Sequence, residues 1–489
     1  MKTHRSVAGV LGAVALVLSG CASVPERVGL PVAVHTVMAD KGLPVDSLAV
    51  VAYPLDDRSR GLRVQAGRLM SPGSTLKLVT AVVALETLGP NARAATELRV
   101  LHPPNDQGVL ATPLYVRGLG SADLGYGELH QLLRELREQG VRVLQGGVVL
   151  DRSAFRPERF DLGLAPFDEA PEFPYNVIPD ALQLAGSLQR LELSSEGSEG
   201  LRARLSPALP GIAVDVAQIT LVARNCSDWE DGWRLPEVVP GAGESVTVRL
   251  KGAFPRDCKV SQLLQLVDRQ VLWEKALRQF WKELGGEWPD DAPVQQGVTP
   301  QESTVLARHV ERPLAEVVRG LMKRSDNAQT RLLYLRLGSA RAQGDESTQA
   351  AAARAVQDWF ERRGLNAQGL VLDNGSGLSR SERVSVTQLA DLLQAVWTEQ
   401  RHLPELLTSL PVAGEDGTMG RRLKGSAAQG RARLKTGTLR DAVGLAGYVW
   451  DQRGRPWVMA ALVNHDSPNL PERGRAVLDA VAEWIARQP

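Results

Sequence analysis

The chain has 489 residues, of which 43% are hydrophobic and 23% are charged, and its formal net charge at pH 7 is +1. This length is sufficient for two to four domains with hydrophobic cores, and the composition is that of an ordinary globular protein. The near-neutral charge and the lack of a basic cluster argue against nucleic acid as a partner.

The first 20 residues have the pattern of an export signal. Lys2 and Arg5 give a positive start, and residues 7–18 form an apolar run that is too short for a comfortable membrane span. The run ends in Leu-Ser-Gly before Cys21, which is similar to a bacterial lipobox, and a small residue follows. We expect residues 1–20 to be a lipoprotein signal peptide and Cys21 to carry lipid, which anchors the protein in the outer membrane, facing the periplasm. The alternative is a plain secretory signal with an incidental cysteine.

The first motif with chemical meaning, Ser-Thr-Leu-Lys at 74–77, follows two predicted strands at 48–53 and 62–66. An apolar run over residues 76–88, closed by a Gly-Pro pair, predicts a helix. The three-residue spacing places Ser74 and Lys77 on one face, one turn apart. The helix dipole stabilises a developing alkoxide, and burial would lower the pKa of the lysine and make it a neutral base. The alternative is an ordinary core helix.

A long region of mixed pattern separates the first motif from the second. Residues 132–138 predict a helix and residues 141–150 a strand-like segment. Apolar and polar residues alternate over 190–251, which predicts an all-β module. An amphipathic helix is predicted over 268–284, with its aromatic side chains in the core.

The second motif, Ser325-Asp326-Asn327, lies between two predicted helices. In the functional interpretation, Ser325 passes a proton between Lys77 and a leaving amine. Asn327 would hydrogen-bond either Lys77 or the substrate amide, while Asp326 serves the structure. Because these residue types also cap helices well, a plain capping role is the alternative.

The third motif, Lys435-Thr436-Gly437-Thr438, precedes a predicted hairpin. Its cation and two hydroxyls suit a terminal carboxylate, and Gly437 would let a substrate approach the backbone closely. The backbone N–H groups of Ser74 and Thr438 are the expected oxyanion hole. A solvent-exposed turn is the alternative.

The three motifs in this order are the set found in serine β-lactamases and penicillin-binding proteins. Two further segments narrow the resemblance: residues 373–380 read Asp-Asn-Gly-Ser-Gly-Leu-Ser-Arg, and residues 410–418 read Leu-Pro-Val-Ala-Gly-Glu-Asp-Gly-Thr. With its long gap between Lys77 and Ser325, the chain resembles the D-alanyl-D-alanine carboxypeptidase/endopeptidase family. These are the low-molecular-mass, class C penicillin-binding proteins of peptidase family S13.

The resemblance implies an α/β (α+β) penicillin-binding-protein/β-lactamase-like transpeptidase domain, with an antiparallel sheet flanked by helices. It also implies two smaller inserted domains, one α/β and one mostly β. We expect residues 28–95 and 306–489 to form the catalytic domain, 96–160 and 262–305 the α/β insertion, and 161–261 the β-rich insertion.

The resemblance also implies the activity: a serine-type D-Ala-D-Ala carboxypeptidase with DD-endopeptidase activity on peptidoglycan stem peptides, acylated by β-lactams and needing no metal or other cofactor. Asp151, in a segment similar to the family's Asp-x-Ser-x-Phe, would meet the ammonium of a diamino acid side chain. Arg380 would pair with the distal carboxylate. A strand-end acid and a structural arginine are the alternatives.

Cys226 and Cys258 are the two remaining cysteines. In an exported protein we expect them to form a disulfide, as some family members do in this region, and two buried free thiols are the alternative. Two other functions stay open. One is a serine β-lactamase, against which the long insertion argues, and the other is a non-catalytic, lipid-anchored peptidoglycan-binding protein.

Overall fold

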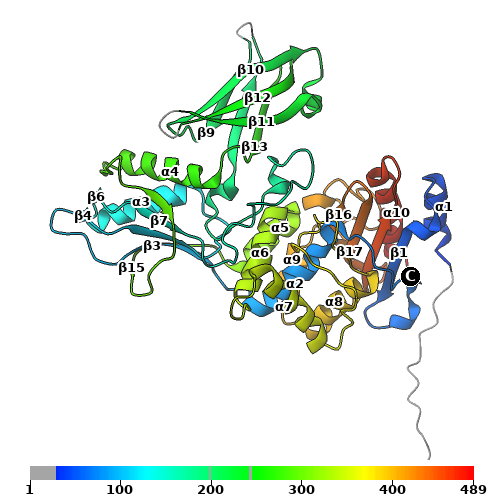
Figure 1. The fold of residues 1–489 in the computed structure, drawn as a ribbon. Helices are drawn as coiled ribbons and strands as arrows, with labels where there is room; N and C mark the ends of the chain where they lie inside the picture. Colours follow the sequence, from blue (N-terminus) through cyan, green and yellow to red (C-terminus); the bar gives the residue numbers. More distant parts are fainter. Residues whose placement is uncertain (1–28, 198–199, 242–244) are drawn as a thin grey trace, which may run out of the picture.

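A computed structural model describes residues 29–197, 200–241 and 245–489 (Figure 1). The predicted signal peptide and Cys21 lie outside the described residues. Within the described ranges, none of the helices combines the length and the apolar character that a membrane crossing requires. Separate sheets divide the chain into a catalytic part, an α/β insertion and a β-rich insertion.

The catalytic part is built on an antiparallel sheet of five strands in the order β16-β17-β18-β1-β2. Its strands are β1 (Leu48–Pro54), β2 (Leu62–Val64), β16 (Ala432–Thr438), β17 (Ala442–Trp450) and β18 (Pro456–Asn464). The strands predicted near residues 48 and 62 and the predicted C-terminal hairpin are confirmed. Because β1 pairs with β18, the two ends of the sequence meet in one sheet. The third motif lies on β16, at the edge of this sheet.

Helices cover both faces of this sheet, which explains why β1 is buried along its whole length. Alternate side chains of a strand point to opposite faces. Ala49, Val51 and Tyr53 belong to one core and Leu48 and Val50 to the other. Helices α1 (Val32–Asp40) and α10 (Leu470–Ala486) enclose the second core. The first core contains α2 (Lys77–Leu88), α5 (Leu314–Arg324), α6 (Asn327–Ser339), α7 (Thr348–Arg362), α8 (Val386–Glu399) and α9 (Leu403–Ser409).

The α/β insertion has a five-stranded mixed sheet in the order β14-β7-β5-β3-β15. Its strands are β3 (Ala95–Val100), β5 (Leu114–Gly118), β7 (Val148–Asp151), β14 (Val294–Gln296) and β15 (Thr304–Val310), and its helices are α3 (Tyr126–Glu138) and α4 (Arg269–Glu283). A short parallel pair, β4 (Val109–Leu110) and β6 (Val143–Leu144), lies beside them. The aromatic side chains of α4 pack in this core, as predicted.

The strands shift the expected limits of this insertion. The entering strand β3 and the returning strand β15 are antiparallel neighbours, and Ala95 is the register partner of Val310. Both strands belong to the inserted sheet, so the chain returns to the catalytic part after Val310 and not at residue 306 as expected. The sequence of β15 is too weakly patterned to reveal its partner, which lies some 200 residues earlier in the chain.

The β-rich insertion contains two three-stranded sheets, β10-β12-β11 and β13-β8-β9, and lies at the top in Figure 1. Its strands are β8 (Gln189–Ser194), β9 (Arg202–Ser206), β10 (Ile212–Val222), β11 (Trp233–Pro240), β12 (Val246–Pro255) and β13 (Lys259–Leu264). The all-β pattern is thereby confirmed, and β13 extends past the expected limit at residue 261. The disulfide between Cys226 and Cys258 is also confirmed.

Candidate active site

Ser74 lies in the 3-10 turn Gly73–Leu76, directly before α2, and Lys77 is the first residue of that helix. The two side chains meet, because Lys77 Nζ donates a hydrogen bond to Ser74 Oγ at 2.8 Å. The helix predicted from the apolar run is confirmed, and its first nine residues are buried. Lys77 is among them and has no exposed surface.

The buried amine of Lys77 has two further acceptors. Its Nζ donates to Asn327 Oδ1 at 2.6 Å and to the backbone carbonyl of Ser376. Burial lowers the pKa of Lys77 to about 7, against the opposing effect of Glu382 and Asp326, whose negative charges raise it. A lysine with such a pKa is partly neutral near pH 7, and the neutral form can take a proton from the serine beside it.

The second motif forms the junction between α5 and α6. Ser325 ends α5 in the left-handed conformation, with φ of 59°, and Asp326 caps α6 by accepting a hydrogen bond from the Gln329 N–H. Asn327 is the first residue of α6, and its side chain contacts Lys77, as one of the two expected alternatives required. Capping and active-site contact are therefore both real, but they fall to different residues of the motif.

The third motif brings a second lysine to the site. Lys435 has no exposed surface and donates to Ser325 Oγ at 2.8 Å and to the Thr436 carbonyl at 2.8 Å. Burial, together with the nearby positive charge of Lys77, holds the pKa of Lys435 well below its usual range. Two lysine–serine pairs thus lie side by side: Lys77 with Ser74, and Lys435 with Ser325.

The hydroxyls of the third motif have protein partners as well. Thr436 Oγ1 donates to Thr418 Oγ1 at 2.8 Å, and Arg475 donates to Thr438 Oγ1 at 3.2 Å. Thr418 belongs to the segment of residues 410–418, and Arg475 lies on α10. These contacts anchor the third motif to the elements on either side of it.

The described residues contain no group of three or more His, Cys, Asp and Glu side chains that could hold a metal ion.

Gly437 lets the edge strand lie directly against the turn that carries Ser74. A Cβ atom at position 437 would stand 2.5 Å from the Pro72 carbonyl oxygen and 3.1 Å from the Ser74 amide nitrogen. A Cβ on Gly73 would likewise stand 3.0 Å from the Thr438 amide nitrogen. The close approach is thus between two parts of the protein, and it brings together the two segments whose N–H groups are expected to form the oxyanion hole.

Asp151 is not placed for the role predicted for it. It ends β7 with 1% of its surface exposed, and its carboxylate accepts hydrogen bonds from the backbone N–H groups of Ser153 and Thr299 at 2.9 and 2.8 Å. Both oxygens are occupied by local backbone, so the alternative, a strand-end acid, is correct. Arg380 is exposed, and its guanidinium lies 5.3 Å from the centre of the Phe167 ring.

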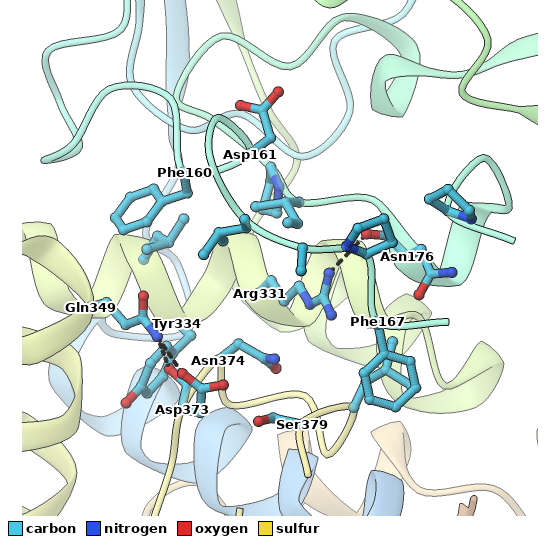
Figure 2. A pocket seen from close by; sticks show the side chains of 18 of the residues that line it. Phe160, Asp161, Phe167, Asn176, Arg331, Tyr334, Gln349, Asp373, Asn374 and Ser379 are labelled. Carbon is cyan, nitrogen blue, oxygen red and sulfur yellow. Dashed lines mark hydrogen bonds between the residues drawn. The ribbon is translucent and has the colours of Figure 1, made fainter. Parts of the chain in front are cut away.

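A cavity of about 490 Å³ adjoins the site (Figure 2). It lies between helix α6, the turn at residues 373–379 and the inserted segment of residues 160–179, which connects β7 to β8. In Figure 2, Arg331 reaches from α6 toward the inserted segment, and its Nη1 donates to the carbonyls of Asn176 and Val177 at 3.0 Å. Phe167, under Arg380, is part of the cavity wall. The polar lining consists of Asp161, Asn176, Gln265, Arg331, Gln349, Asp373, Asn374 and Ser379.

Sequence reasoning missed several residues that support this site. Tyr175 accepts a hydrogen bond from Asn327 Nδ2 through its backbone carbonyl, at 3.1 Å. Ser376 acts through its carbonyl, and Glu382 lies buried behind it. A backbone acceptor can be any residue type, so the sequence carried no signal for these contacts, although residues 373–380 had been singled out by the resemblance.

The chain matches the model of the D-Ala-D-Ala carboxypeptidase 3 (S13) family over residues 30–488. It belongs to this family. Among curated relatives of the S13 chain, a D-alanyl-D-alanine carboxypeptidase of Actinomadura sp. (strain R39) is 29% identical over 451 residues, which cover 86% of this chain and 77% of the relative. The D-alanyl-D-alanine carboxypeptidase DacB of Haemophilus influenzae is 26% identical over 472 residues, 95% and 94% of the two chains.

A solved structure confirms the expected fold of the S13 chain. Penicillin binding protein 4 (dacB) of Haemophilus influenzae superimposes with a TM-score of 0.76 at 22% identity, over 93% of this chain and 99% of that one. The same protein in complex with a β-lactam gives a TM-score of 0.73 at 22% identity, over 90% and 96% of the chains. The S13 chain therefore has the penicillin-binding-protein fold, with its insertions, along nearly its whole length.

Proposed function

We propose that this S13 protein is a serine-type D-Ala-D-Ala carboxypeptidase that forms an acyl-enzyme on Ser74, and that it also cleaves D-Ala cross-links in peptidoglycan. One observation carries the proposal: the buried amine of Lys77, whose pKa burial lowers to about 7, stands 2.8 Å from Ser74 Oγ. The family and the names of the two carboxypeptidase relatives support the substrate class.

Acylation begins when Lys77 takes the proton of Ser74 and the serine oxygen attacks the carbonyl carbon of the D-Ala-D-Ala bond. The N–H groups of Ser74 and Thr438 hold the oxygen that becomes negative. Lys77 then returns the proton through the Ser325 hydroxyl to the nitrogen of the departing D-alanine, and the C–N bond breaks. Lys435, Thr436 and Thr438 bind the terminal carboxylate of the substrate, whose negative charge favours protonated Lys435.

Deacylation uses the same groups in reverse order. A water molecule gives a proton to Lys77 and attacks the ester carbonyl, and Ser74 recovers its proton as the peptide leaves. A cross-link presents the same carbonyl with a longer amine on the leaving side, so endopeptidase activity needs no new chemistry. β-Lactams present a similar carbonyl and would acylate Ser74, which agrees with the β-lactam complex of the Haemophilus influenzae relative.

The decisive experiment is mass spectrometry of the intact soluble chain, without residues 1–21, after incubation with benzylpenicillin. We expect one stable adduct that maps to Ser74, and release of D-alanine from a D-Ala-D-Ala peptide. The variant Ser74→Ala should lose both. Ser467→Ala is the control, because Ser467 also starts a Ser-x-Asn sequence but pairs with Arg473 on α10. Hydrolysed penicillin without an adduct would favour a β-lactamase, and neither product would favour a peptidoglycan-binding protein.

We also propose that the protein is an exported lipoprotein, anchored in the outer membrane through Cys21 and facing the periplasm. The disulfide between Cys226 and Cys258 supports export, because disulfides persist in oxidising compartments. The test is expression of the full chain in a Gram-negative host fed with labelled palmitate. The protein should carry the label, and Cys21→Ser should not. Label that persists in that variant would refute lipidation at this cysteine.

A further inference from the structure

A buried acid, Glu382, lies next to the active site and has no step assigned to it in the mechanism above. Glu382 has no exposed surface. Its Oε1 accepts hydrogen bonds from the backbone N–H groups of Asn374 at 3.1 Å and Gly375 at 2.8 Å, and its Oε2 accepts from Ser379 N–H at 3.3 Å. One carboxylate therefore closes the turn of residues 374–379 from both of its ends.

The middle of this turn contacts Lys77 directly, and it packs against Gly73, the residue before Ser74. The Ser376 carbonyl accepts a hydrogen bond from Lys77 Nζ, the amine that faces Ser74. Gly377 has φ of 84°, and a Cβ atom there would stand 1.9 Å from the carbonyl oxygen of Gly73. The turn thus supplies one of the two acceptors that, with Ser74, orient the lysine amine, the other being Asn327 Oδ1, and it also packs against the turn that carries Ser74.

The turn has some support of its own. Asn374 Oδ1 accepts hydrogen bonds from the N–H of Ser376 at 3.0 Å and from its hydroxyl at 2.6 Å. In the second half of the turn, the Leu378 N–H donates to Ser376 Oγ at 3.3 Å. The Ser379 hydroxyl lies 2.9 Å from that of Ser381, while the Ser379 N–H donates to Glu382. Loss of the carboxylate would loosen the turn without abolishing it, so a graded change in rate is expected, and a structural collapse is not.

We propose that Glu382 is a positioning residue for acylation: its buried carboxylate holds the turn of residues 374–379 so that the Ser376 carbonyl keeps the Lys77 amine directed at Ser74. The inference rests on the proposed acylation of Ser74. Glu382 also acts through its charge, since a carboxylate near an amine favours the protonated amine. The ionisable groups that face it are Lys77 on α2, Arg331 and Tyr334 on α6, and Asp373 on its own segment.

The charge effect has a definite sign. Burial raises the pKa of Glu382 to about 7, and burial lowers that of Lys77 to the same value, so both groups titrate near neutrality. Lys77 acts as a base only when neutral, and acylation is therefore lost as the pH falls through its pKa. An ionised Glu382 raises the pKa of Lys77, and its replacement by a neutral residue should move this acid limb to lower pH.

The test compares Glu382→Gln and Glu382→Asp, with the rate constant for acylation by benzylpenicillin measured from pH 5 to 9. For the glutamine variant we expect an acid limb about one pH unit lower, at the small end of what a nearby charge contributes. Its rate at the optimum should also fall about tenfold, because an amide cannot accept from both ends of the turn. The aspartate variant keeps the charge but is too short, so we expect an unmoved limb and a loss of up to about 100-fold, as a misplaced reacting group gives.

The matched control is Glu311→Gln. Glu311 is also fully buried, and its carboxylate accepts hydrogen bonds from the backbone N–H groups of Ala94 and Ala122. It forms an ion pair with Arg336 and has no contact with Ser74 or Lys77. This control should leave the pH profile unchanged. Folded Glu382→Gln with a wild-type profile, or an equal shift in the control, would overturn the inference. If Glu382→Gln does not fold, the aspartate variant decides alone, and a wild-type rate there overturns it. Failure of wild-type Ser74 to be acylated would instead refute the proposed function.

Discussion

Two buried lysines share the active site, and their hydroxyl partners separate their roles. Lys77 faces the nucleophile Ser74, whereas Lys435 faces Ser325 on the side where the substrate carboxylate is expected. Burial lowers the pKa of both, and the charge of Lys77 lowers that of Lys435 further. Two adjacent buried cations repel each other, so the arrangement disfavours the state in which both lysines are protonated. A lysine that readily gives up its proton suits a reaction in which a base must first take a proton and then return it.

Gly377 is a position beside the active site at which a single added methyl group should be harmful. Gly377→Ala combines strain at φ of 84° with a clash at 1.9 Å against the Gly73 carbonyl. We expect a loss of about 2–4 kcal/mol in the free energy of unfolding and much slower acylation. Urea titration and penicillin labelling measure the two effects. The control is Gly364→Ala, where φ is 64° and nothing lies within 4 Å, so that only backbone strain is added. Equal losses in both variants would contradict this account.

Side-chain chemistry was predictable from the sequence, and backbone chemistry was not. Ser74, Lys77 and Asn327 were predicted to meet because their types and order match a known set, and they do meet. Asp151 was misassigned because an acid at a strand end has the same sequence signature whether it faces a cleft or two local N–H groups. Glu382 gave no signal, because its partners are backbone amides.

At the scale of elements, the site is assembled where four segments end or begin. The 3-10 turn before α2, the junction of α5 and α6, the edge strand β16 and the turn of residues 374–379 each contribute one or two groups. Termini of elements can place side chains and backbone N–H groups at the same point. Hydrophobic periodicity predicted the helices α2, α5 and α6, whereas the strand β16 and the turn of residues 374–379 were not predicted as elements. The pairing of β1 with β18 and of β3 with β15 required tertiary information.

The β-rich module depends on its disulfide. The cysteines are 32 residues apart, and a bridge over a loop of this size stabilises a folded unit by roughly 3 kcal/mol in the loop-entropy model. We expect the double variant Cys226→Ser/Cys258→Ser to lower the unfolding temperature of this module, seen as faster amide hydrogen exchange in β10, β11 and β12. Acylation of Ser74 should stay near the wild-type rate, since the bridge belongs to a separate core. Unchanged exchange would contradict a stabilising role.

At the scale of the whole molecule, the inserted segment of residues 160–179 is connected to the active site through α6. Asn327 donates to the Tyr175 carbonyl, and Arg331 donates to two carbonyls of the same inserted segment. Both residues also bear on Lys77, Asn327 by a hydrogen bond and Arg331 by its positive charge. A change in how the insertion seats on α6 would therefore reach the catalytic base.

Arg331 offers a direct test of this coupling. Its charge lowers the pKa of Lys77, so Arg331→Met should raise that pKa and move the acid limb of acylation to higher pH, opposite to the shift expected for Glu382→Gln. The variant also leaves two carbonyls of the insertion without their donor, and the KM for a peptide substrate should rise. Arg331→Lys keeps the charge and should keep the limb. A limb that moves to lower pH in Arg331→Met would show that the coupling has the wrong sign.

The pairing of β3 with β15 means that the insertion leaves and returns at one place. Ala95 and Val310 are register partners, and one step further out the Glu311 N–H donates to the Ala94 carbonyl at 3.0 Å. The catalytic part of the chain therefore ends and resumes at two residues that are hydrogen-bonded neighbours, so the insertion leaves almost no gap between them. Residues 95–310 are one continuous segment of the chain, so this segment could be exchanged or shortened by design without rerouting any strand of the catalytic sheet.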